Sequence, residues 1–229
     1  AIFPFLANSA SAKDKSKYTA HIQKTIQRIL FFTLPSAAGL MTLSSETVDL
    51  ILSGGIFDAQ SVKITGLILF FFSLSIPFES LTHILARAFY AVKDTLTPMI
   101  INISAMSIMA LTTIFIAPDY GIEWFSIGFT VGFAFYVTLA TILIRKKLQD
   151  FDIKIFSLSL LKTIIATLLM TVIVLSLDQL ENIVSLKLAT VSRISIGAFI
   201  YFITAKLLKS PEIESVNYII SRILKKKVI

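Results

Sequence analysis

Long apolar runs separated by short polar segments dominate the pattern of this 229-residue chain. A helix that spans a bilayer needs ~20 mostly apolar residues. Six runs meet that length and predict membrane-spanning helices at residues 22–52, 61–90, 98–117, 121–145, 155–177 and 187–208. The first two runs are longer than a bilayer requires, and each contains a proline, Pro35 or Pro77. We therefore expect these two helices to be kinked or tilted.

The beginning of the chain follows a different pattern. Residues 1–10 resemble the end of a preceding helix, and residues 11–20 form a polar, basic linker. The chain opens at Ala1, without the basic-then-apolar pattern of a signal peptide. We therefore expect it to be a fragment that begins inside a longer protein.

The composition is that of an all-α polytopic membrane protein. The chain is 55% hydrophobic and 15% charged, whereas soluble domains are about a quarter charged. There is no Cys, and the two His residues lie far apart, so we expect no disulfide and no Cys- or His-based metal site. No nucleophile elbow, phosphate-binding loop or HExxH motif is present. We therefore expect a protein that is not an enzyme and that binds no cofactor.

The distribution of charge predicts orientation in a membrane. The formal net charge is +7, and all but four of the 21 Lys and Arg residues lie at one end of the predicted helices. The loops at the other end, 53–60, 117–124 and 178–186, contain acids but no Lys or Arg. Basic loops stay on the cytoplasmic side, so both chain ends are predicted to be cytoplasmic. This one-sided pattern argues against nucleic-acid binding.

Ionisable side chains inside the second run are the first candidates for a functional site. Glu79, His83 and Arg87 recur every four residues and so share one helix face, which Ser75 extends. Charges inside a membrane span are costly and usually functional. The stripe is either a polar cavity wall that contacts a charged headgroup or relays protons, or a buried Glu79–His83 pair that ties helices together.

Other charged residues admit simpler interpretations. Lys24 and Arg28 are also four residues apart, and they either anchor the first helix at the membrane surface or face a cavity and meet a phosphate. Lys162 and Arg193 lie near span ends and are expected to snorkel to the interface. Asp150 and Asp152 are the one candidate for a metal–diphosphate site, although they lie in a basic loop.

Three local patterns add detail. Thr97-Pro98 predicts a helix start, with Thr97 as the cap and Pro98 at the first helical position. Gly128 and Gly132 have the spacing that allows close helix packing. Residues 212–227 form a basic amphipathic tail that lies either on anionic lipid or in solvent.

Three motifs in order resemble the MurJ/MviN lipid II flippase family. They are Leu34-Pro35-Ser36-Ala37-Ala38-Gly39-Leu40, Gly54-Gly55-Ile56-Phe57-Asp58, and Arg87-Ala88-Phe89-Tyr90-Ala91 followed by Asp94-Thr95-Leu96-Thr97-Pro98. The likeness covers most of residues 1–145, and the rest by hydropathy only. It implies the two-lobed, all-helical exporter fold of that superfamily, with this chain as the carboxy-terminal half. Residues 1–20 would end a preceding helix and form a linker, 21–178 would supply five helices of the second lobe, and 179–229 the last helix and the tail.

The resemblance also implies a function. Family members turn the undecaprenyl-diphosphate-linked peptidoglycan precursor, lipid II, across the bacterial cytoplasmic membrane by alternating access, and their late helices form a groove for the lipid tail. The family places a cavity arginine just before the Leu-Pro motif; Arg28 is nearest, and Gln27 occupies the equivalent position. Tyr136 stands where many members have Asn, so no sodium site is implied.

The expected roles divide into binding and gating. Candidate substrate-binding residues are Lys24, Arg28, Glu79, His83 and Arg87, and candidate gate or hinge residues are Pro35, Pro77, Tyr90, Asp94, Thr97 and Pro98. The expected partners are lipid II, membrane lipids and the upstream half of the same protein. The alternatives are a related exporter of polysaccharide-linked lipid or drugs, and an integral membrane enzyme that acts on prenyl diphosphates.

Overall fold

The computed structural model describes residues 15–54, 57–146, 152–178 and 185–213. Within these ranges the chain is helical, without a β-strand, which confirms the predicted all-α class. The helices are α2 Lys15–Thr42, α3 Ser44–Leu52, α4 Ala59–Ser73, α5 Ile76–Ala91, α6 Leu96–Phe115, α7 Ala117–Tyr120, α8 Glu123–Arg145, α9 Ile153–Ser176 and α10 Leu186–Leu207. Residues 1–10 and most of the basic tail lie outside the described ranges. Residues 15–20, expected as linker, are the first turns of α2.

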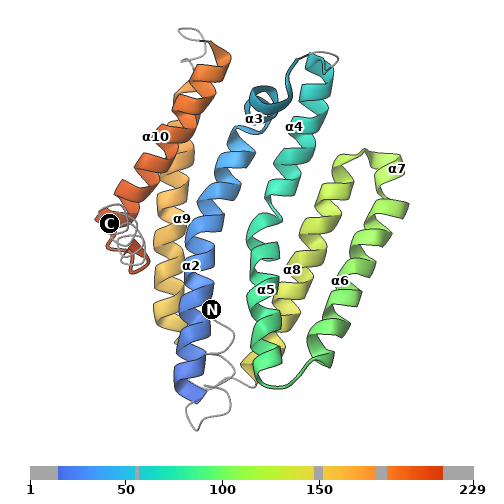
Figure 1. Ribbon diagram of the computed structural model, residues 1–229, viewed down its shortest axis with the longest axis vertical. Coiled ribbons are helices and arrows are strands. Elements are labelled where there is room, and N and C mark those ends of the chain that lie inside the picture. Colours follow the sequence, from blue (N-terminus) through green and yellow to red (C-terminus); the bar gives the residue numbers. More distant parts are fainter. Residues whose placement is uncertain (1–14, 55–56, 147–151, 179–184, 214–229) are drawn as a thin grey trace, which may run out of the picture.

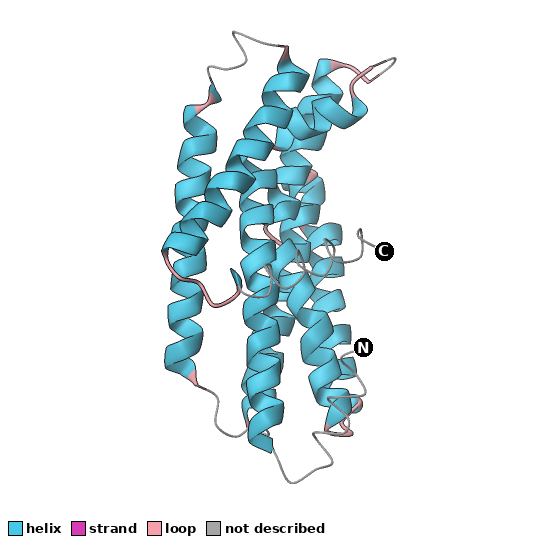
Figure 2. Ribbon diagram, turned by 60° about the vertical axis from the view of Figure 1, so that its left-hand side comes forward, coloured by secondary structure: helices cyan, strands magenta, loops and turns pink. Residues whose placement is uncertain are grey.

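The long helices run side by side as an upright bundle (Figures 1 and 2). In the described residues, α6, α8, α9 and α10 are each long and apolar enough to cross a membrane. The pairs α2–α3 and α4–α5 are also long and apolar enough to cross a membrane when each bent pair is taken as one span. This agrees with the six predicted spans. In Figure 1 the start of α2, the end of α5 and the end of α8 lie at the lower end, and α3 and α7 lie at the upper end. The basic and acidic loops are therefore separated along the bundle axis.

Two apolar cores hold the bundle together. The first joins α2, α5, α6 and α8 around residues such as Ile22, Leu85, Phe89 and Ile144, all at most 2% exposed. The second joins α2 to α9 and α10 around Phe31 and its neighbours. Helix α2 belongs to both cores, so it lies between the α9–α10 pair and the rest of the bundle.

The first predicted span is bent, as expected, but helix α2 continues through Pro35 and the break lies further on. Proline has no N–H, so the carbonyl of Phe31, four residues earlier, loses its helical donor. The Tyr201 hydroxyl of α10 donates to that carbonyl at 2.5 Å instead. The sharp bend, 80°, comes later, at Leu43 between α2 and α3. There α3 packs on α4, where a Cβ at Gly66 would lie 2.6 Å from Ser45 Oγ.

The predicted break near Pro77 is present. Helix α4 ends at Ser73, α5 begins at Ile76 with Pro77 in its first turn, and the two axes differ by 41°. The Ser75 hydroxyl donates to the Phe72 carbonyl at 2.8 Å, which satisfies one carbonyl at the break. Proline thus bends the span where its missing N–H would fall.

The turn between α5 and α6 is capped by Asp94 rather than by Thr97. Asp94 Oδ1 accepts the Thr97 N–H at 3.0 Å, and Asp94 Oδ2 accepts the Thr97 hydroxyl at 2.7 Å. Helix α6 begins at Leu96, so Pro98 lies inside its first turn and is buried. The expected helix start is right to within two residues, but the capping side chain is the carboxylate before it.

Helices α6 and α8 approach closely at the two predicted glycines. A Cβ at Gly132 would lie 2.6 Å from Met109 Cγ and 2.9 Å from the Ala105 carbonyl oxygen, and one at Gly128 would lie 3.0 Å from Thr112 Cβ. The small-residue spacing therefore does position two helix backbones.

Replacement of Gly132 by Ala should lower stability by about 1–3 kcal/mol, because the added methyl group overpacks the contact between α6 and α8. Gly39→Ala is the matched control, since its Cβ would meet only Met170 Cε at 4.0 Å. Thermal unfolding of the two variants in detergent makes the comparison. Equal melting temperatures would show that the contact between α6 and α8 is looser than described.

Removal of the Asp94 carboxylate by Asp94→Ala should cost about 1 kcal/mol of cap energy at the start of α6. Amide hydrogen exchange in the first turn of α6 should become faster, while the middle of the helix keeps its protection. Asp119→Ala, an exposed carboxylate at the other end of α6, serves as control. Unchanged exchange at Thr97 would contradict the capping role.

Candidate functional site

The charged stripe of α5 lies on the face that the described chain leaves uncovered. His83 and Arg87 are exposed and Glu79 is partly exposed, while Leu81 and Leu85 pack on the opposite face. In the described residues no side-chain hydrogen bond or ion pair joins Glu79 to His83. The stripe is therefore arranged as an open wall, and it does not form a buried pair.

The cations of α2 share this arrangement. Lys24 and Arg28 are exposed, whereas Gln23 and Gln27 are buried against the start of α9. Gln23 Nε2 donates to the Asp152 carbonyl at 2.9 Å, and Gln27 Nε2 donates to the Ile155 carbonyl at 3.4 Å. Arg28, and not Gln27, is therefore the side chain on the open face.

Helices α2 and α5 are packed neighbours that run in opposite directions. The Tyr18 hydroxyl donates to the Ala88 carbonyl at 2.5 Å, which places the start of α2 beside the end of α5. Arg87 and Tyr90, which is 44% exposed, lie at the same end of the bundle as this contact. The described contacts do not join the α2 stripe to the α5 stripe directly.

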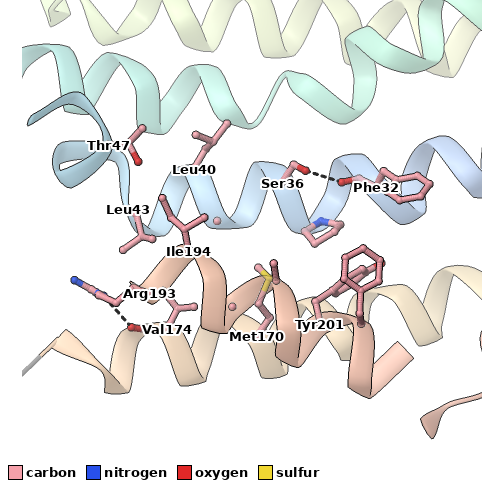
Figure 3. A pocket seen from close by; sticks show the side chains of 15 residues that line it. Phe32, Ser36, Leu40, Leu43, Thr47, Met170, Val174, Arg193, Ile194 and Tyr201 are labelled. Atoms are coloured by element: carbon pink, nitrogen blue, oxygen red, sulfur yellow. Dashed lines mark hydrogen bonds between the residues drawn. The ribbon is translucent and has the colours of Figure 1, made fainter. Parts of the chain in front are cut away.

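An apolar pocket of about 330 Å³ lies between α2, α3, α9 and α10. Figure 3 shows Phe32 and Ser36 of α2 on one side, and Met170 of α9 with Ile194 and Tyr201 of α10 on the other. We call this pocket the α2–α10 groove. Phe32 and Ser36 continue, at four-residue steps, the line of exposed positions that starts with Lys24 and Arg28. The exposed line along α2 thus runs from two cations into an apolar groove.

Arg193 closes one end of the groove, and its placement differs from the sequence prediction. It is 1% exposed, so it does not snorkel to the interface. Its Nε donates to the Val174 carbonyl at 3.3 Å (Figure 3), and its Nη1 pairs with Glu46 at 3.4 Å and with Asp178 at 3.2 Å. Lys162, the other residue expected to snorkel, donates from Nζ to the Lys209 carbonyl at 3.0 Å.

The acidic residues do not assemble a metal site in the described part of the chain. No group of three His, Cys, Asp or Glu side chains is placed to hold a metal ion there. Asp152 Oδ1 accepts the Ile155 N–H at 3.0 Å and so caps α9, and Asp150 lies outside the described residues. Glu212 is buried and accepts a hydrogen bond from Ser159. These contacts assign two of the acids to structure.

The family resemblance implied a groove in the late helices, but the residues themselves did not locate the α2–α10 groove, because those that line it are ordinary apolar residues of three separate runs. One signal was present: an arginine, Arg193, inside the last apolar run. A charge about ten Å along a span needs partners, and Glu46 of α3 and Asp178 after α9 supply them.

Comparison with known proteins agrees with the sequence resemblance and with the fold. A family profile described as "Lipid II flippase MurJ" matches residues 1–202. The "Probable lipid II flippase MurJ" of Thermotoga maritima is 28% identical over 211 residues, which are 92% of this chain and 42% of that protein. The "Lipid II flippase MurJ" of Thermosipho africanus is 26% identical over 199 residues, 87% of this chain and 39% of that protein.

A solved structure has the same fold. The chain resembles "Lipid II flippase MurJ, inward closed conformation" with a TM-score of 0.76 and 23% sequence identity, over 90% of this chain and 42% of that one. The chain therefore spans about two fifths of the length of the relatives it matches. Because the family profile covers most of its residues, this chain belongs to the lipid II flippase MurJ family.

Proposed function

We propose that this chain is part of a lipid II flippase and supplies helices of its second lobe with a groove for the lipid tail. The observation that carries the proposal is the exposed line on α2, where Lys24 and Arg28 lead into the apolar groove at Phe32 and Ser36. An isoprenoid lipid with a diphosphate head has the same order of charge and apolar surface. The family membership supports lipid II as that substrate.

The charged side chains lower the main free-energy cost of lipid translocation, which is the transfer of the charged head. A diphosphate and its sugar-peptide head must cross an apolar slab, where unpaired charge is strongly disfavoured. Arginine binds phosphate through two parallel N–H groups. We assign Arg28 and Lys24 to the head, Arg87 to the mouth of the cavity, and His83 and Glu79 to the polar wall behind it.

The bends provide places at which the lobe can move. Alternating access requires segments that rotate without loss of their backbone hydrogen bonds. The breaks at Leu43 and before Pro77, and the short turn at Asp94, divide the spans into rigid parts. We assign Tyr90 and Asp94, with Thr97 and Pro98, to an inner gate, and Pro77 to a hinge. Pro35, predicted as a hinge residue, lies within the unbroken helix α2, so we assign the hinge of the first span to Leu43.

The remaining assignments follow from this role. No covalent bond changes when a lipid is flipped, so the chain acts as a transporter and not as an enzyme. The basic loops support a cytoplasmic position for both chain ends, in a multi-pass protein of the bacterial cytoplasmic membrane. The chain spans 42% of the Thermotoga maritima relative, so we expect it to work with an upstream half that completes the cavity, among the membrane lipids.

Arg87→Glu should abolish rescue of cells depleted of their own lipid II flippase, because a carboxylate at the cavity mouth repels the diphosphate. The variant is tested in a chimera that joins the amino-terminal half of the Thermotoga maritima relative to residues 1–229. Lys63→Glu, an exposed charge reversal on α4, is the control. Normal growth of the Arg87→Glu strain, with the protein at normal level in the membrane, would refute the role of Arg87.

Residues 1–229 alone should fail to rescue the same cells, because the opposite wall of the cavity is missing. Co-expression with the amino-terminal half of the relative should restore growth. Membrane fractionation checks that the chain inserts in both strains. Rescue by the chain alone would show that it forms a complete path for the lipid head.

A further inference from the structure

Arg193 is the one charged residue among those that line the α2–α10 groove. It lies seven residues into α10, about 10 Å from the start of that helix at ~1.5 Å per residue. It is also 1% exposed, and burial of an unpaired charge at such a depth is very unfavourable. The contacts of its guanidinium therefore determine how this end of the groove is built.

Those contacts come from three different elements. The Val174 carbonyl belongs to α9, Glu46 lies in the first turn of α3, and Asp178 follows the end of α9. The two carboxylates differ in burial, since the side chain of Glu46 is 22% exposed and that of Asp178 is 73% exposed. Loss of an exposed partner costs little, whereas loss of a mostly buried partner leaves a buried charge uncompensated and is strongly destabilising. Glu46 is therefore the partner that matters.

Helix α3 is the segment that this ion pair holds. It follows the 80° bend at Leu43, and Leu43 and Thr47 line the groove beside Arg193 (Figure 3). Helices α9 and α10 form the opposite wall of the groove. They pack closely, because a Cβ at Gly197 would lie 2.8 Å from Val174 Cγ2. The guanidinium thus bridges the bent α3 segment to a rigid α9–α10 pair.

We propose that Arg193 is a positioning residue that closes the outer end of the α2–α10 groove by clamping α3 through Glu46. Through this clamp, whether the outer end of the groove is open or closed depends on the bend between α2 and α3. Two carboxylates already neutralise the arginine, so this end of the groove binds no lipid phosphate and receives only apolar chain. The assignment of that chain to a lipid tail rests on the proposed function, whereas the clamp itself does not.

The test uses the 229-residue chain in lipid nanodiscs, and it exploits the absence of cysteine from the sequence. Spin labels at Ile51→Cys and Leu188→Cys, both exposed positions on α3 and α10, report the distance between the two helices by pulsed electron resonance. In a second series, maleimide labelling of Thr47→Cys reports whether the outer end of the groove is open. Neither readout requires lipid II.

Arg193→Met and Glu46→Gln should both broaden the Ile51–Leu188 distance distribution toward longer distances. Labelling of Thr47→Cys should become faster by about an order of magnitude, because loss of one partner of a buried pair is strongly destabilising. Glu46→Gln keeps the arginine in place and so remains informative if Arg193→Met folds poorly. Lys187→Met, an exposed cation in the first turn of α10, and Asp178→Asn should change neither readout appreciably.

Unchanged distances and labelling rates in a well-folded Glu46→Gln variant would overturn the clamp. An equal change in Lys187→Met would also overturn it, because the effect would then follow from lost charge alone. Failure of the clamp leaves the proposed function standing, since that function depends on the groove and the α2 cations. Conversely, a chain that never binds lipid II can still show the clamp.

Discussion

The hydrogen bond from the Tyr201 hydroxyl to the Phe31 carbonyl is the contact on which the arrangement of these helices depends. Inside a bilayer no water is available to satisfy a free carbonyl, so the group that Pro35 leaves without a donor must find one in another helix. Tyr201 supplies it from α10, and the same ring lines the groove. The contact thereby joins α10 to α2 beside Pro35; α2 continues to Thr42, and the sharp bend lies at Leu43.

This contact explains why the groove and the cationic positions lie along one helix. Because α2 is unbroken at Pro35, its exposed line passes from Lys24 and Arg28 directly to Phe32 and Ser36. A break at the proline would have turned these two halves in different directions. Helix α2 also belongs to both apolar cores, so a movement of α2 relative to α5 would carry the groove with it.

The helices follow from local features of the sequence, and their predicted positions agree with the structure. Apolar runs locate the spans to within a few residues, except at the start of α2, and the short polar turn before Pro98 separates two of them. The open faces of α2 and α5 follow from four-residue spacing, since a helix repeats every 3.6 residues. The four-residue spacing of Gly128 and Gly132 also predicts the close contact between α6 and α8 at Gly132.

What could not be predicted depends on contacts between distant segments. Arg193 lies near the end of an apolar run, and such a position by itself suggests snorkelling. Its burial requires Glu46, which lies 147 residues earlier in the chain. The continuity of α2 at Pro35 likewise requires Tyr201, a contact across 170 residues. Hydrophobic periodicity carries no information about such pairs, and the groove forms only where they meet.

We propose that the exposed line of α2 holds the lipid, with the head at the cations and the tail in the groove. Photocrosslinking with lipid II labelled in its isoprenoid tail tests this directly, in a chain completed by an upstream half. A photoreactive residue in place of Phe32, which is 41% exposed in the groove, should capture the labelled tail. The same residue in place of Leu111, 53% exposed on α6, should give only the background of bulk lipid contact. Equal capture at both positions would contradict the account.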